Sequence, residues 1–330
     1  MTAAAHDLAG FVPIRLWPQN GAATVTWCHV GDAPFAEPFF QQTVDRHQGL
    51  PGALRTTPVE TLLDVAAKSD GLELSGLLFH LSRCGSTLIS QMLAASRRHT
   101  TLSEPTVVDD IVRAAALAGV EHDVRIEWLR AAVAALGRRR GGRGGRAGRL
   151  FVKVDPLDLL DLSTFLHAFP GVPWIFLYRD PLEVLVSQQR NTSTFLRVGT
   201  VDLARLGLGV EEALEMPAAN YRAHVLGNLA GTVLAHLERG GRLVEYRRLP
   251  GAIDDVLTHF GVTVTAAEHE AMIEVSQFDA KVPGTAFEPD TERKRRQATE
   301  DVRAAALSIR PVFERLERRR RSQLVITTGP

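Results

Sequence analysis

The chain has 330 residues, of which 45% are hydrophobic and 23% charged, enough for one large globular domain or two small ones. Its 38 lysines and arginines equal its 38 aspartates and glutamates, which excludes a strong net field for nucleic acid or an anionic membrane. No apolar run approaches the roughly 20 residues that span a bilayer. Two cysteines are too few for a disulfide framework, and residues 1–10 carry no secretory pattern. We therefore expect a cytoplasmic protein that binds neither nucleic acid nor a membrane.

Residues 1–75 are expected to form an N-terminal α+β extension packed on the main domain. Thr24 to Val30 alternates in the manner of a strand. Glu37 to His47 and Pro58 to Ala67 are expected to be helices, the second with a proline near its first turn. This section contains no sequence pattern that is typical of catalysis or ligand binding, and we expect it to cover the substrate.

From Gly76 onward, apolar strands alternate with amphipathic helices. Residues 76–330 are therefore expected to form a P-loop-type three-layer α/β fold, with a central parallel sheet flanked by helices. The arginine- and glycine-rich residues 137–148 cannot bury a core and are expected to be a flexible loop. Two roles stay open for the helix-rich C-terminus: it could cover the sheet or form a homodimer.

The most informative segment is a polar turn that follows the apolar strand Gly76 to Leu81 and precedes an amphipathic helix. A turn of this kind points backbone N–H groups and a helix N-terminus at an anion. Its hydroxyl groups and arginine add further donors. The pattern predicts a phosphate cradle formed by Ser82, Arg83, Cys84, Gly85, Ser86 and Thr87. It is not the P-loop of ATPases, because the turn has no lysine before the hydroxyl residue.

A second polar segment follows another apolar strand, Val172 to Tyr178. Arg179 leaves the end of this strand, and Pro181 is suited to the first turn of a helix. Ser187 lies eight residues after Arg179, about two helical turns away.

The two segments resemble the cofactor motifs of sulfotransferases that use 3′-phosphoadenosine-5′-phosphosulfate (PAPS). The turn is similar to the 5′-phosphosulfate loop, roughly [PS]-[KR]-[SC]-G-[ST]-[ST]. Residues 179–187 are similar to the 3′-phosphate motif, R-[DN]-P-x-[DE]-V-x-x-S. The resemblance covers about Gly76 to Val262 and implies that Arg179 and Ser187 clamp the 3′-phosphate of PAPS.

Two weaker matches follow towards the C-terminus. Residues 243–262 resemble the family segment Y-E-D-L followed by a hydrophobic helix and F-L-G, with Arg247-Arg248 in place of the acidic pair. Tyr246, in this segment, is a candidate nucleotide contact or a core aromatic residue. The run 290–296 is either a solvated helix face or a basic flap that closes on the 3′-phosphate through Arg293 and Lys294. It lacks the R-K-G signature of the cytosolic family members.

Sulfuryl transfer requires positioning, charge stabilisation and one base for the acceptor proton. Arg83 and the loop hydroxyls would stabilise charge on the leaving phosphate. Lys153, in a Lys-x-Asp pattern at a strand end, resembles the lysine of the family's K-T-H and K-D-P segments. The resemblance implies that this lysine reaches the bridging or sulfuryl oxygens. No metal is required, and the sequence has no H-x-x-x-H or C-x-x-C spacing.

Two carboxylates are candidates for the base. Glu104, in Leu-Ser-Glu-Pro, matches the position of the acidic base in tyrosylprotein sulfotransferases, and burial is expected to raise its pKa. Its alternative roles are to cap the next helix or to pair with an arginine. Asp155 matches the position of the base in the cytosolic enzymes, but would also cap a helix that starts at Pro156. We prefer Glu104 over Asp155, and interpret His80 as a core residue.

The sequence thus predicts a PAPS-dependent sulfotransferase whose acceptor, a small molecule or peptide with a hydroxyl or amine, is unidentified. An ATP-dependent phosphotransferase and a nucleotide hydrolase with Mg²⁺ on Asp155 are alternatives on the same fold. A non-catalytic nucleotide-binding module is a third.

Overall fold

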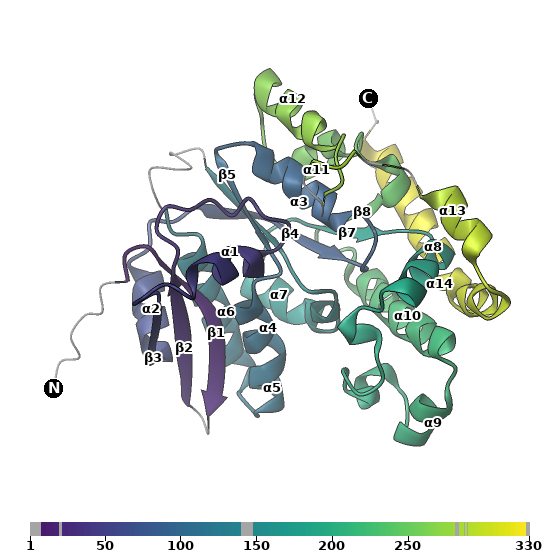
Figure 1. Cartoon of the computed structure of the whole chain (residues 1–330), viewed down its shortest axis with the longest axis horizontal. Coiled ribbons are helices and arrows are strands. Elements are labelled where there is room, and N and C mark those ends of the chain that lie inside the picture. Colours follow the sequence, from purple (N-terminus) through teal and green to yellow (C-terminus); the bar gives the residue numbers. More distant parts are fainter. Residues whose placement is uncertain are drawn as a thin grey trace.

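The computed structural model (Figure 1) describes residues 8–19, 22–139, 148–280, 284–286, 288 and 290–327, with side chains described as far as residue 324. At its centre is a five-stranded parallel sheet in the order β5-β6-β4-β7-β8. Its strands are β4 Glu73–His80, β5 His99–Ser103, β6 Arg149–Lys153, β7 Trp174–Tyr178 and β8 Gly241–Glu245. The predicted α/β fold with a central parallel sheet is confirmed.

Helices cover both faces of this sheet because its strands are apolar on both sides. In β4, Leu77 and Phe79 belong to one hydrophobic core and Leu78 to the other, as the alternation of side chains along a strand requires. The core around Leu78 is closed by α3 Ser86–Ala95, α11 Ile253–His259 and α12 Ala266–Val275 (Figure 1). The opposite core includes α6 His122–Leu136, α7 Leu162–Ala168, α8 Pro181–Arg190, α10 Ala218–His236 and α14 Glu300–Thr327.

Shorter helical pieces fill the connections. The helical stretch after β5 consists of α4 Thr106–Asp109, the π-helical turn η1 Asp110–Ala114 and α5 Ala115–Leu117. The other short helices are η2 Pro156–Asp161, η3 Thr194–Leu196, η4 Leu203–Leu206, α9 Val210–Glu215, η5 Tyr246–Arg248 and α13 Thr291–Gln297.

The N-terminal section forms a separate antiparallel sheet in the order β1-β2-β3. Its elements are β1 Phe11–Gln19, β2 Ala22–His29, α1 Phe40–His47, β3 Leu54–Pro58 and α2 Val59–Ala67. The predicted strand and both helices are confirmed, although α1 begins three residues later than expected. Strand β1 is fixed to η1 by Arg15, whose Nε donates to Asp110 at 2.8 Å.

Of the predicted flexible loop 137–148, the structure describes residues 137–139 and 148, and residues 140–147 lie outside the described residues. Gly137 ends α6, and Gly148 leads into β6. None of the helices in the described chain combines the length and apolar character needed to cross a membrane.

Candidate active site

The predicted cradle forms the turn between β4 and α3. Gly85 is the N-cap of α3 with φ 84°, a left-handed conformation that suits glycine. A Cβ atom at this position would lie 2.8 Å from both Leu249 and Tyr246, so a larger residue would collide as well as strain the backbone. Helix α3 begins at Ser86, directly after this turn.

Two cavities meet at this turn. One has a volume of about 470 Å³ and the other of about 190 Å³, and both are lined by Arg83, Ser86 and Thr87. The Nε of Arg83 is buried and has no hydrogen-bond partner in the described chain. A buried guanidinium N–H without a partner is costly, so this group is suited to bind an anion in the turn.

The smaller cavity brings together residues from distant parts of the sequence. It is lined by Arg179 at the end of β7, Ser187 on α8, Tyr246 after β8 and Lys294 on α13. The guanidinium of Arg179 lies 3.9 Å from the centroid of the Tyr246 ring. Four of the residues that the sequence assigns to the nucleotide therefore share one cavity.

Arg179 is already held by two carboxylates. Its Nε donates to Glu183 at 2.7 Å, and its Nη2 donates to Asp290 at 2.6 Å. The Nζ of Lys294 lies 2.8 Å from the other oxygen of Asp290. Burial alone would raise the pKa of Asp290, but hydrogen bonds from Lys294 and Arg179 lower it, so this carboxylate is charged.

Three predicted residues lie away from the two cavities. The side chain of Cys84 is buried in the core below α3, with Leu78 and Ile89. Arg293 is exposed on α13 and lines neither cavity. Lys153 is completely buried and also lines neither, but its Nζ lies 3.0 Å from Oε1 of Glu104.

The larger cavity contains Glu104, which follows β5. The backbone of Glu104 has φ 57°, and Arg83, with φ 65°, is the other non-glycine residue with positive φ in the described chain. Conformations of this kind are strained and cluster at functional sites. The backbone N–H of Glu104 donates to the carbonyl of Lys153 at 2.7 Å, which joins the ends of β5 and β6.

Glu104 is the centre of a charged cluster. Its Oε1 lies 3.2 Å from Nε2 of His80, in addition to its contact with Lys153. Burial would raise the pKa of Glu104, but Lys153 and His80 lower it to about 2. The expected raised pKa of this carboxyl is therefore wrong, because two basic side chains converge on one oxygen.

Asp155 has the capping role that its sequence context predicts. Its Oδ1 accepts from the backbone N–H of Leu157 at 2.9 Å, at the start of η2. It also lines the larger cavity, 3.7 Å from Nη2 of Arg113. Burial raises its pKa, so Asp155 could bind a proton from the cavity.

Arg113 lies on the π-helical turn η1 and joins two further carboxylates. Its Nη2 lies 2.9 Å from Asp109 and its Nε 3.1 Å from Asp158, whose side chain is completely buried. Burial raises the pKa of Asp109 to about 7 and raises that of Asp158 as well. Arg113 carries one positive charge, and three carboxyl groups lie beside it: Asp109, Asp155 and Asp158. One arginine cannot balance three negative charges, so the pair Asp109–Asp158 retains a proton near neutral pH.

The rest of the larger cavity was not predicted. Phe39, from the segment before α1, lines it and lies with its ring centroid 4.8 Å from Nζ of Lys153. The segment after α8 supplies Ser193, whose hydroxyl lies 3.0 Å from that of Ser82. It also supplies Asn191, Thr194, Phe195 and Thr200. A segment rich in hydroxyl side chains has no sequence pattern that marks it as part of a binding site. His80 also lines this cavity, although its sequence context predicts a core residue.

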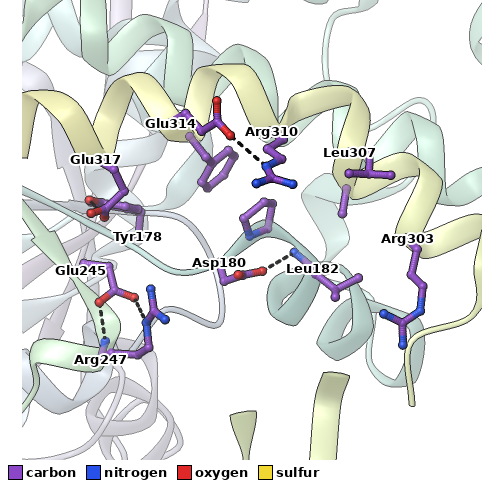
Figure 2. A pocket seen from close by; sticks show the side chains of 13 residues that line it. Tyr178, Asp180, Leu182, Glu245, Arg247, Arg303, Leu307, Arg310, Glu314 and Glu317 are labelled. Carbon is purple, nitrogen blue, oxygen red and sulfur yellow. Dashed lines mark hydrogen bonds and ion pairs between the residues drawn. The ribbon is translucent and has the colours of Figure 1, made fainter. Parts of the chain in front are cut away.

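A third cavity, of about 520 Å³, opens between α14 and the start of α8 (Figure 2). Two ion pairs lie within its lining: Arg247 with Glu245 at 2.9 Å, and Arg310 with Glu314 at 2.9 Å. None of the predicted site residues lines it. Within the described residues, no group of three or more histidines, cysteines, aspartates or glutamates is placed to hold a metal ion.

No protein-family model matches the chain, and no curated protein matches it. The structure is similar to sulfotransferase STF9 from Mycobacterium avium, at 12% identity and a TM-score of 0.46 over 78% of this chain and 80% of that one. It is also similar to a sulfotransferase from Alicyclobacillus acidocaldarius, at 15% identity and a TM-score of 0.41 over 76% and 96% of the two chains. The sulfotransferase domain of the Synechococcus PCC 7002 olefin synthase matches at 15% identity and a TM-score of 0.40, over 75% and 97%. At such low similarity, function has to be inferred from the chain's own residues.

Proposed function

We propose that the protein is a sulfotransferase that moves the sulfuryl group of PAPS to a hydroxyl or amine of a small acceptor, and that it works in the cytoplasm. The observation that carries this proposal is the meeting of two cavities at one anion-binding turn. A donor bound in the smaller cavity would present its phosphosulfate at Arg83, Ser86 and Thr87, which also line the larger cavity. The lack of a disulfide at Cys28 and Cys84 agrees with a reducing compartment.

The smaller cavity supports a donor with a 3′-phosphate. Arg179, Ser187 and Lys294 offer two cations and a hydroxyl to one anion, and the Tyr246 ring gives a flat apolar surface beside them. A volume of about 190 Å³ is less than most ligand pockets, at roughly 300–1,000 Å³. Nucleotide binding would therefore require Asp290 to move away from Arg179 and Lys294.

The larger cavity supports a small, polar acceptor. Beyond the turn, most of its lining is hydroxyl, amide or charged: Ser193, Thr194, Thr200, Asn191, Arg113 and Asp155. Such a wall can hydrogen-bond to several polar groups of an acceptor, and Phe39 and Phe195 can contact its apolar face. A volume of about 470 Å³ suits a small molecule or a single side chain of a larger acceptor.

Roles follow from these positions. Arg83 and the hydroxyls of Ser86 and Thr87 would stabilise the charge that develops on the leaving phosphate oxygen. Lys153 is completely buried against Glu104, so its role in this structure is to keep Glu104 ionised. Glu104, with a pKa of about 2, binds a proton weakly, and Asp155 is the other carboxylate on the cavity wall.

Calorimetric titration with 3′,5′-ADP, 5′-AMP and ATP–Mg²⁺ tests the proposal. We expect tight binding of 3′,5′-ADP alone, together with sulfuryl transfer that is unchanged by EDTA. Tight binding of ATP–Mg²⁺ would instead indicate a phosphotransferase or nucleotide hydrolase and would overturn the proposal. Binding of 3′,5′-ADP without transfer to any acceptor, in a panel of polyols, phenols, amines and peptides, would indicate a non-catalytic nucleotide-binding module.

A further inference from the structure

We propose that His80, held by Glu104, is the catalytic residue that takes the proton from the acceptor. The proposal rests on the sulfotransferase function proposed above and assigns the base of that reaction. It moves the base from the two carboxylates that sequence favours to a histidine interpreted there as a core residue.

His80 is buried, but it faces the acceptor cavity. It is the last residue of β4, two positions before the turn, and its side chain is 4% exposed. It lines the same cavity as Arg83 and Ser86, where the sulfuryl group would lie. A base at this position would lie beside the place where the acceptor substrate binds.

The two ring nitrogens of His80 have different surroundings. Both nitrogens are buried, and neither makes a hydrogen bond of regular geometry in the chain as described. Nε2 lies 3.2 Å from Oε1 of Glu104, whereas Nδ1 has no charged partner. An ionised carboxylate accepts hydrogen bonds only, so its closeness to Nε2 favours the neutral ring with its proton on Nε2. Nδ1 then carries the free lone pair that a base requires.

Glu104 is itself held in place from two sides. Lys153 Nζ lies 3.0 Å from the same carboxylate oxygen, and the backbone N–H of Glu104 donates to the carbonyl of Lys153 at 2.7 Å. Lys153, Glu104 and His80 come from the ends of β6, β5 and β4, so the sheet fixes their relative positions. The arrangement is that of a base oriented by a carboxylate, and Glu104 is the positioning residue.

The proposed step balances without a redox partner. The acceptor O–H bond breaks and its proton goes to Nδ1 of His80, while the oxygen's electron pair forms a bond to sulfur. The bond between sulfur and the phosphate oxygen breaks, and its electron pair stays on that oxygen. Glu104 stabilises the imidazolium that results, and the imidazolium later loses its proton to water.

Five other charged groups lie around this site on the neighbouring elements. They are Glu104 after β5, Lys153 on β6, Asp155 after β6, Arg113 on η1 and Arg83 in the turn. Burial raises the pKa of Asp155, so an acid fall in rate would not by itself identify the base. The tests therefore follow the position of the proton on His80 and the rate at one fixed pH.

The first test needs no acceptor. In ¹⁵N-histidine-labelled protein with 3′,5′-ADP bound, we expect the His80 signals at pH 8 to show a protonated Nε2 and an unprotonated Nδ1. Glu104→Gln should abolish this fixed tautomer. His80→Gln assigns the signals, and His99→Gln is the matched control, because His99 is also buried in the sheet but has its Nδ1 3.0 Å from the carbonyl of Leu93.

The second test follows turnover with ³⁵S-labelled PAPS and glycerol, glucose or 2-naphthol as acceptor probes. We expect His80→Gln to lower kcat by about 10²-fold or more, and to leave 3′,5′-ADP affinity and the acceptor KM within about threefold. His99→Gln should keep the wild-type rate.

The outcomes separate the two proposals. If wild-type protein does not bind 3′,5′-ADP, the sulfotransferase function falls, and the assignment of His80 falls with it. If it binds 3′,5′-ADP but His80 carries its proton on Nδ1 at pH 8, only the assignment of His80 is overturned. Wild-type turnover in His80→Gln would overturn it equally.

Discussion

The carboxylate of Asp290 lies 2.6 Å from Nη2 of Arg179, at the point where the sequence motif predicts a phosphate. The other oxygen of Asp290 lies 2.8 Å from Nζ of Lys294. A carboxylate between two cations occupies the place that a phosphate would take. Under the proposed function, Asp290 would compete with the nucleotide, and its charge would have to be displaced before a 3′-phosphate could bind.

The variant Asp290→Asn tests this competition. It removes the competing charge but keeps the shape of the side chain, so we expect 3′,5′-ADP to bind about five- to tenfold more tightly, as for loss of roughly 1–1.4 kcal/mol of competing interaction. Titration calorimetry of both proteins measures the change, with Asp254→Asn on α11 as an ion-paired surface control. Weaker binding by Asp290→Asn would mean that Asp290 holds Arg179 in its binding position.

The preference for a 3′-phosphate should depend on Arg179 and Ser187. Loss of a charge-assisted hydrogen bond costs about 1.5–3 kcal/mol, so Arg179→Ala should reduce the affinity ratio of 3′,5′-ADP to 5′-AMP roughly 10- to 100-fold. Ser187→Ala should reduce it by up to about tenfold, because the serine contributes one hydrogen bond to the phosphate and no positive charge.

Arg179→Ala also leaves the fully buried Glu183 without one of its cations, which could unfold the protein. Ser187→Ala does not have this defect, since Ser187 is only partly buried on α8. If both variants fold and the ratio of affinities stays at the wild-type value, the 3′-phosphate is bound elsewhere.

The sequence predicts those parts of the site that are local in the chain. Ser82–Thr87 and Arg179–Ser187 each lie within one strand–turn–helix unit, where periodicity and turn residues determine the conformation. The contact of Arg179 with Asp290 joins residues 111 positions apart, and no local pattern records it. Strands β1 and β3 were missed because Pro13, Pro18 and Pro58 are unfavourable within strands.

The cluster of His80, Glu104 and Lys153 shows the same limit. From its neighbours in sequence alone, His80 is a core histidine, and Glu104 is a candidate base, a helix cap or the partner of an arginine. The contact between them arises because β6 lies between β5 and β4 in the sheet, an order that the alternation of strands and helices leaves open. The pKa of Glu104 was mispredicted for that reason.

The turn should not tolerate a side chain at position 85. In Gly85→Ala the new Cβ would lie 2.8 Å from Tyr246 and from Leu249, in a backbone conformation with φ 84°. We expect a loss of at least about 1–2 kcal/mol in unfolding free energy from backbone strain alone. Nucleotide binding should weaken because Tyr246 lines the same cavity.

Urea unfolding and 3′,5′-ADP titration measure both effects of Gly85→Ala. Gly171→Ala is the matched control, since Gly171 also has positive φ, at 81°, but a Cβ added there would meet no atom within 4 Å beyond its own chain neighbours. It should lose stability without losing nucleotide affinity. Equal effects of the two substitutions on binding would contradict a specific role for the turn.

The proton shared by Asp109 and Asp158 should make stability depend on pH. Burial raises the pKa of Asp109 to about 7 in the folded chain and raises that of Asp158, against roughly 3.9 for an unfolded aspartate. The folded state therefore binds a proton that the unfolded state has lost. This contribution to stability is complete below about pH 4 and is lost as the pH rises through 7.

Asp158→Asn keeps the shape of the protonated acid but cannot ionise, and it leaves Asp109 paired with Arg113 at 2.9 Å. Relative to this variant, the wild type should lose about 1–3 kcal/mol of unfolding free energy between pH 5 and 8. Urea unfolding at four pH values measures the difference, and Asp64→Asn, at an exposed position on α2, should leave the wild-type slope unchanged. Parallel pH profiles of the wild type and Asp158→Asn would show that the pair is already ionised and that Arg113 balances both charges.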